Sequence, residues 1–248
     1  MPDEAFDDLD RQTQRAVAGL IRLALSAETR RSSLKRDEIA KKCSRPSAMS
    51  IDSMITAANL KLTEVFGYQI VELPPKESYK LDSLPAKRGT RAYVVVDVHD
   101  KPDNTNHLKA YERFENTHLI GILHTILAVV LASGGIISDT HLYSHLKKLG
   151  LNQSQCLPNE DKLTLESFIN SLSRQSYLEK KKSSIGNHDM EFSWGARALV
   201  EIGENNIAQF MIHIINISRR DSSNDATQEI NDKMLEDLQR GIGHSWNS

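Results

Sequence analysis

The stretch LTLESFINSLSRQSYLEKKKSSIGNHDMEFSW, residues 163–194, has the pattern of one amphipathic helix followed by two strands. The helical part places four apolar side chains on one face, at Leu165, Phe168, Ile169 and Leu172. The two strand-like runs, QSYLEKKK and MEFSW, are joined by SSIGNHD, in which Gly186 and Asn187 tolerate a positive φ. A helix followed by a β-hairpin is typical of the second half of a winged helix, a variant of the helix-turn-helix.

The residues on both sides of this stretch supply the other helices of such a module. Upstream, HLIGILHTILAVVLASGGII (118–137) has no charged residue, but His124, Thr125 and Ser133 interrupt it, and Gly134-Gly135 end it. This pattern predicts a buried core helix and not a membrane span. Ser138 or Asp139 is then expected to cap a short helix through HLYSHLKKL. Downstream, ARALVEIG and NIAQFMIHIINI predict a final pair of helices.

The first half of the chain repeats this order. Apolar spacing predicts helices at about 10–27, over LKRDEIAKKC after Ser33, and from Met54 to Val65. The β-branched runs YQIVEL (68–73) and RAYVVVDV (91–98) then predict two strands. We therefore expect a mainly α protein with small β-wings, an α+β fold of tandem winged-helix domains.

Charge and composition predict where these domains begin and end. Residues 1–10 hold five acids, and residues 221–248 hold six acids against Lys233 and Arg240, whereas the rest of the chain has a net charge of +7. A basic body with acidic ends suits a polyanionic partner. The expected organisation is a disordered N-terminus at 1–9, a first winged helix at 10–100, a linker at 101–112, a second winged helix at 113–220 and a disordered acidic tail at 221–248.

The sequence gives little support to catalysis, metal binding or secretion. The two cysteines stand 113 positions apart, and no GxSxG, GxxxxGK[ST] or HExxH motif occurs. His141 and His145 share a helix face, but no acid or cysteine lies near them at ligand spacing. The acidic first ten residues do not have the character of a secretory leader. We expect no catalytic residue, no metal, no cofactor, no small-molecule substrate and no membrane association.

Five pieces of the sequence, in order from about residue 15 to residue 220, resemble the MAGE homology proteins. They are VAGLIRLALSAETRRSSLKRDEIAKKC, FGYQIVELP, LHTILAVVLASGGIISDTHLYSHLKKLGL, FINSLSRQSYLEKKK and EFSWGARALVEI. The last piece, with Trp194, Gly195, Arg197 and Ala198, is the most specific, although Ala196 stands where a proline is usual. Within the family, the chain looks like the branch that serves as the non-SMC element three subunit of the SMC-five/six complex, from a fungus or a similar eukaryote.

The resemblance implies a non-catalytic nuclear, chromatin-associated subunit of a DNA repair complex. Such a subunit pairs with a RING-type subunit through its first winged helix, binds the kleisin subunit with its second, and binds double-stranded DNA. The family's RING contact corresponds here to Leu23, Ala24 and Leu25. For the kleisin contact, the partly apolar last helix suggests Phe210 and Met211, with Tyr143 and Leu146 as neighbours.

Two basic surfaces are candidates for the DNA contact. The resemblance favours cations beside the helices and wing of the second module: Lys147, Lys148, Arg174, Lys180, Lys181 and Lys182. Charge count alone favours the first module, at Arg30, Arg31, Lys35, Arg36, Lys41 and Lys42. Either set would bind phosphates without reading bases. Two other functions remain open: a MAGE-type cofactor of a RING ubiquitin ligase acting only through protein contacts, and a sequence-specific transcription factor, which the few base-reading residues on the third helices make the weaker alternative.

Overall fold

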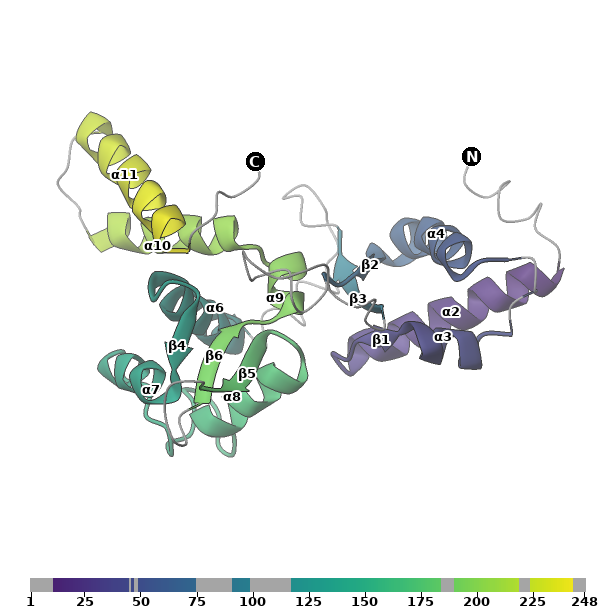
Figure 1. The fold of residues 1–248 in the computed structure, drawn as a ribbon, viewed down its shortest axis with the longest axis horizontal. Coiled ribbons are helices and arrows are strands. Elements are labelled where there is room, and N and C mark those ends of the chain that lie inside the picture. Colours follow the sequence, from purple (N-terminus) through teal and green to yellow (C-terminus); the bar gives the residue numbers. More distant parts are fainter. Residues whose placement is uncertain are drawn as a thin grey trace. The chain divides into compact units, whose positions relative to one another are not determined.

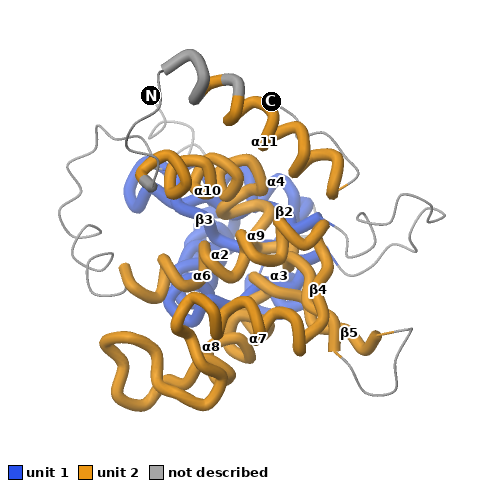
Figure 2. The backbone as a smooth tube through the Cα atoms, turned by 90° about the vertical axis from the view of Figure 1, so that its left-hand side faces the viewer, with its two compact units in different colours: residues 1–105 blue, residues 106–248 orange. Residues whose placement is uncertain are grey.

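The computed structural model describes residues 11–44, 46, 49–74, 91–98, 117–183, 190–218 and 224–242. The chain divides into two compact units, residues 1–105 (unit 1) and 106–248 (unit 2), coloured separately in Figure 2. The division falls within the segment predicted as a linker. That segment, the N-terminal residues 1–9 and the wing turn 184–189 lie outside the described residues.

Unit 1 is a winged helix with one strand more than the sequence predicted. Its elements in chain order are α2 (Arg11–Thr29), β1 (Leu34–Lys35), α3 (Arg36–Lys42), α4 (Ile51–Lys61), the π-helix η1 (Leu62–Phe66), β2 (Tyr68–Glu72) and β3 (Ala92–Asp97). The antiparallel sheet has the order β1-β3-β2. A core stripe on α2, formed by Ala16, Val17, Leu20, Ala24 and Ala27, packs against α4 and the sheet.

Unit 2 repeats the arrangement and extends it with three C-terminal helices (Figure 1). Its elements are α6 (Thr117–Ala132), β4 (Ile136–Ser138), α7 (Asp139–Lys148), α8 (Leu165–Arg174), β5 (Leu178–Lys182), β6 (Met190–Trp194), α9 (Ala196–Glu201), α10 (Glu204–Ser218) and α11 (Asn224–Ile242). The sheet order β4-β6-β5 matches the order in unit 1. The fold class of tandem winged helices is therefore confirmed.

The uncharged segment around residue 125 is a core helix. Six residues of α6 are buried, and they face α7, α8 and the sheet within one apolar core. The prediction of a core helix is confirmed. Among the described helices, none combines the length and the apolar character that crossing a bilayer requires.

Three local predictions need correction. Each sheet has a third strand, β1 or β4, which is too short at two or three residues to show an alternating pattern. Ser33 does not cap the next helix, because Leu34 and Lys35 pair with β3 and the helix begins at Arg36. Helix α11 occupies 224–242 within the tail that was predicted to be disordered. Its apolar residues Leu235, Leu238 and Ile242 pack against the core of unit 2.

Candidate functional site

The three consecutive lysines of β5 lie on two different faces of the sheet. Side chains alternate along a strand, so Lys180 and Lys182 project on the side of buried Leu178 and Phe192, which the helices of unit 2 cover. The Lys180 ammonium lies 5.5 Å from the centre of the Phe192 ring. Lys181 points to the opposite face, where its Nζ lies 3.1 Å from a carboxylate oxygen of Glu179. Glu191 is its partner across the strands. Lys181 therefore has a carboxylate partner, whereas Lys180 and Lys182 have none among the described residues.

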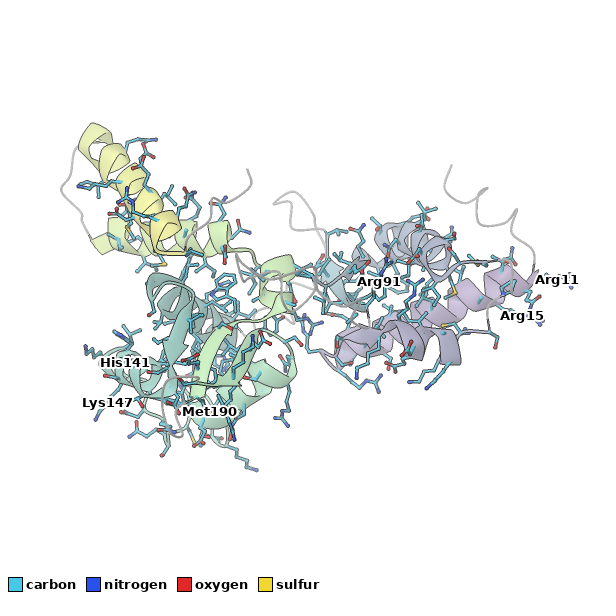
Figure 3. The ribbon with its side chains drawn as sticks, viewed as in Figure 1. Arg11, Arg15, Arg91, His141, Lys147 and Met190 are labelled. Atoms are coloured by element: carbon cyan, nitrogen blue, oxygen red, sulfur yellow. The ribbon has the colours of Figure 1, made fainter. Side chains whose placement is uncertain are left out.

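Helices α7 and α8 add three exposed cations to unit 2. Lys147 and Lys148 are in the last turn of α7, which packs against β4 and β6, and Arg174 ends α8. Figure 3 shows Lys147 toward the same end of unit 2 as Met190, the cross-strand partner of Lys182. Within the described residues, no carboxylate pairs with any of these cations. We call the set Lys147, Lys148, Arg174, Lys180 and Lys182 the unit 2 basic face.

The cations of the unit 2 basic face are spread over the length of β5. Arg174 lies just before β5 begins, whereas Lys182 is the last residue of that strand. Leu178 and Lys182 are four positions apart along this strand, which corresponds to about 13 Å. The face is therefore extended, as a surface that follows a line of phosphates would be.

The rival basic surface of unit 1 is partly neutralised by its own acids. Arg31 lies 2.8 Å from Glu28, and Lys42 lies 2.7 Å from Glu38. The hydrogen bond from Lys42 holds the pKa of Glu38 below its usual range, so this carboxylate stays charged near neutral pH. Arg30 donates to the backbone oxygen of Ser26.

Arg36 forms the most extensive of these contacts. Its guanidinium donates to both carboxylate oxygens of Asp52, at 2.7 and 3.3 Å, and to the Tyr93 hydroxyl at 3.1 Å. These hydrogen bonds raise the pKa of Arg36 and lower that of Asp52. Since α3 carries Arg36 and α4 carries Asp52, the pair joins two helices and serves the fold. Of the six predicted residues, Lys35 and Lys41 alone are exposed without a described bonding partner.

Asn59, the base-reading candidate on the third helix of unit 1, makes its hydrogen bonds within the fold. Its side-chain amide donates to the backbone oxygen of Ile70 at 3.0 Å and accepts from the backbone N–H of Ile70 at 2.8 Å. This pair of hydrogen bonds ties α4 to the start of the wing. Asn59 is therefore not available to a base edge, which agrees with the expectation of weak sequence readout.

The motif that carried the resemblance, Trp194 to Ala198, holds the wing against the helices. The Trp194 indole donates to the Leu127 backbone oxygen at 3.1 Å in the core. A Cβ on Gly195 would lie only 2.1 Å from the backbone oxygen of Ser176, so only glycine fits. Arg197 is fully buried, its guanidinium 5.6 Å from the Tyr177 ring centre. These residues therefore serve the fold.

The three residues of the predicted RING contact lie on α2 and differ in burial. Ala24 is fully buried in the core of unit 1, so its side chain is not available to a partner, and this corrects the prediction for that residue. Leu23 and Leu25 are half-buried and pack at the edge of the same core. They remain candidates for the contact.

The predicted kleisin contact needs a similar correction. Leu146 is fully buried on the core side of α7, whereas Tyr143 and Met211 are half-buried at the core's edge and Phe210 is half-buried on α10. Burial raises the pKa of Tyr143 to about 12, so its hydroxyl stays neutral. The Phe210 ring lies 5.7 Å from that of His124 on α6. Ile214 and Ile217 belong to the predicted partly apolar last helix but were not among the predicted anchors, and they expose 48% and 54% of their surface on α10. Their i, i+3 spacing was the available signal.

No group of three or more histidine, cysteine or acidic residues that could hold a metal ion occurs in the part of the chain that the structure describes. His141 and His145 are both exposed on α7.

A comparison with known protein families identifies the chain. The MAGE homology domain matches residues 20–205, three quarters of the sequence. The chain belongs to the MAGE homology domain family. The match includes the Trp194 motif and both winged helices apart from the start of α2, whereas most of α10 and all of α11 lie beyond it.

Curated relatives and a solved structure are similar over most of the chain. The mouse (Mus musculus) non-structural maintenance of chromosomes element 3 homolog is 23% identical over 215 residues, covering 85% of this chain and 70% of the mouse protein. Its human (Homo sapiens) counterpart is equally similar, but the match covers 64% of that protein. A chain of a solved "Nse1-Nse3-Nse4 complex" superposes with a TM-score of 0.67 at 18% identity, over 91% of this chain and 99% of that one. At this identity the likeness shows the fold.

Proposed function

We propose that the chain is a non-catalytic subunit of an SMC-five/six type complex in the nucleus, which binds double-stranded DNA without sequence specificity through the unit 2 basic face. In this assembly, unit 1 contacts a RING-type subunit through Leu23 and Leu25. Unit 2 contacts a kleisin through the apolar side chains of α10, together with Tyr143. The chain thereby bridges both subunits on chromatin and contributes to DNA repair.

The unpaired cations of unit 2 support the DNA contact. Lys147, Lys148 and Lys182 are exposed with no described carboxylate partner, whereas the denser cations of unit 1 are largely engaged by Glu28, Glu38 and Asp52. An unpaired lysine can release counterions from a phosphate, whereas a paired lysine must first break its own ion pair. This contrast is the observation that carries the proposal.

The two element 3 homologs and the solved complex support the assembly. The names of those relatives place them with chromosome maintenance, and the complex's title joins three proteins. Apolar side chains exposed on α10 are what a protein partner would cover. Purification of the native chain should therefore yield a RING-type protein and a kleisin with it.

Salt-dependent duplex binding tests the DNA contact. In the variant Lys147→Gln/Lys148→Gln/Lys182→Gln, three unpaired cations are lost, and the slope of log affinity against log salt should fall in magnitude by about three. The control Arg31→Gln/Lys181→Gln/Arg240→Gln removes three cations that have carboxylate partners, so its net charge changes equally. Its slope should change by less than about one.

Binding is measured by fluorescence anisotropy on two duplexes of unrelated sequence, which should bind with equal affinity. Equal slope losses in the variant and its control would contradict the proposal. The absence of duplex binding, with stimulation of the RING partner retained, would favour a ubiquitin ligase cofactor instead. A strong preference for one duplex would favour a transcription factor.

A further inference from the structure

A groove of about 670 Å³ opens on unit 1 beside the N-terminal half of α2 and the end of α3. Its lining includes Arg11, Arg15 and Arg22 from α2 and Lys42 from the end of α3, and no acidic residue is among the described residues that line it. Lys42 is paired with Glu38, so the three arginines are the cations that lack a described carboxylate partner. Figure 3 shows Arg11 and Arg15 at the end of α2. Four cations therefore border one concave surface.

The floor of the groove is small and uncharged. Gly19 has no side chain, and a Cβ there would lie 4.0 Å from the sulfur of Cys43, so the two residues leave depth between the cations. Burial raises the pKa of the Cys43 thiol, which keeps it neutral. The described residues that line the groove consequently supply no negative charge to balance the guanidinium groups.

The three arginines form a line on the exposed side of α2. Their spacing of i, i+4 and i+11 places them within about 40° of one another around the helix axis and spreads them over about 16 Å along it. All three are exposed, and no ion pair among the described residues includes them. Like charges one turn apart repel, so this line is unfavourable unless an anion binds it.

We propose that this groove binds the phosphate groups of a nucleic-acid strand, as a second anion site separate from the unit 2 basic face. Guanidinium groups bind phosphate oxygens in pairs, and their planar forks suit a row of phosphates better than lysine does. A strand presents several phosphates along the length that the arginines span, whereas a single phosphate ion would engage one or two of them. An acidic peptide carries carboxylates instead, and its binding is the alternative outcome.

Two ligands of matched charge distinguish these occupants. One is a single-stranded hexanucleotide with five phosphodiesters, and the other is a peptide with the sequence of residues 1–10, which holds five acids. The full-length chain should bind the hexanucleotide at least tenfold more tightly than the peptide. Inorganic phosphate at the same phosphate concentration should not displace the hexanucleotide. Equal or tighter binding of the peptide, or displacement by inorganic phosphate, would overturn the assignment to a nucleic-acid strand.

Substitutions locate the site. Arg11→Gln/Arg15→Gln/Arg22→Gln should weaken hexanucleotide binding at least tenfold and lower its salt slope by about two, since each single-strand phosphate contact contributes about 0.7. The control Arg30→Gln/Lys35→Gln/Lys41→Gln removes three exposed cations of unit 1 that lie outside the groove, and its slope should change by less than half as much. Thermal unfolding of the groove variant should be unchanged, because no described ion pair is lost.

A groove variant that binds with the wild-type slope, or a control that loses as much, overturns the proposal. The outcome is independent of the unit 2 experiment. If Lys147→Gln/Lys148→Gln/Lys182→Gln still reduces duplex binding while the groove variant binds the hexanucleotide like wild type, the groove assignment fails and the proposed function stands. The reverse result removes the unit 2 contact and leaves the groove.

Discussion

Units 1 and 2 share one order of helices and strands, but they hold the wing against the helices with different chemistry. In unit 1 the contacts are polar. Asn59 on α4 forms hydrogen bonds with the backbone of Ile70 on β2, and Arg36 on α3 donates to Asp52 on α4. In unit 2, close packing does so, through buried Trp194 and the contact of Gly195 with Ser176. Apolar, tightly packed contacts leave the surface cations of unit 2 available to a ligand, whereas those of unit 1 are partly used by the fold.

This difference shows that the density of basic residues in a sequence is a poor guide to a binding surface. The stretch from Arg30 to Lys42 is the most basic part of the chain, yet three of its six candidate cations contact carboxylates. Of the six candidate cations of unit 2, Lys181 alone has a carboxylate partner among the described residues. Whether a cation can bind a ligand depends on whether an acidic side chain lies beside it.

The largest expected effect concerns the close contact in unit 2. In Gly195→Ala, the new methyl group would overlap the Ser176 carbonyl at 2.1 Å, and the backbone would have to move. This shift would disrupt the hydrogen bonds from Gly195 to Tyr177 and from Arg197 to Ser176. We expect a loss of about 3 kcal/mol in the free energy of unfolding.

Urea unfolding followed by tryptophan fluorescence measures this loss, because both tryptophans lie in the half of the chain that contains unit 2. Gly121→Ala is the control, since Gly121 lies in α6 with nothing within 4 Å of a new Cβ. Equal stability of the two variants would show that unit 2 does not depend on this contact.

An intermediate effect is expected for the polar junction of unit 1. Asn59→Ala removes two hydrogen bonds and leaves the N–H and oxygen of Ile70 without these partners in a part-buried position. We expect unit 1 to lose about 2 kcal/mol. Far-UV circular dichroism during thermal unfolding reports this loss, because residues 1–105 contain no tryptophan. The control is Asn170→Ala on α8, an exposed asparagine that should cost little. Similar losses of unfolding free energy in Asn59→Ala and Asn170→Ala would contradict the polar junction described for unit 1.

The smallest effect on stability is expected at Gly19, which, unlike Gly195, has space for a Cβ. Gly19→Ala adds a methyl group at ordinary contact distance from the Cys43 sulfur, inside α2. Alanine is the better helix former, so unit 1 should gain about 0.5 to 1 kcal/mol. Circular dichroism measures the change. A destabilised variant would mean that α2 and α3 pack more closely at this point than the structure shows.

The sequence predicted the main helices and the longer strands because each carries several turns or several alternations of pattern. It predicted Ser138 or Asp139 as a helix cap, and the Ser138 hydroxyl is the group that accepts from the backbone N–H of His141. It missed β1 and β4, which are too short to show a period, and it missed α11. In α11 the acidic composition obscured apolar residues at Ile230, Met234, Leu238 and Ile242, which recur every four residues.

The candidate sites were harder to predict because availability depends on neighbours from distant parts of the chain. Burial of Leu146 and Ala24 follows from which face of each helix meets the core. The pairing of Arg36 with Asp52 joins residues 16 positions apart. The groove beside Arg11, Arg15 and Arg22 requires the end of α3 to lie against α2, which no local pattern indicates.

The most direct test compares two adjacent residues of one strand. Lys181→Gln and Lys182→Gln remove the same charge one position apart, but Lys181 contacts Glu179, whereas Lys182 projects from the opposite face with no described partner. If the unit 2 basic face binds duplex DNA, Lys182→Gln lowers the salt slope of duplex binding by about one unit, and Lys181→Gln leaves it nearly unchanged. Equal effects of the two substitutions, or a larger effect for Lys181→Gln, would contradict the account.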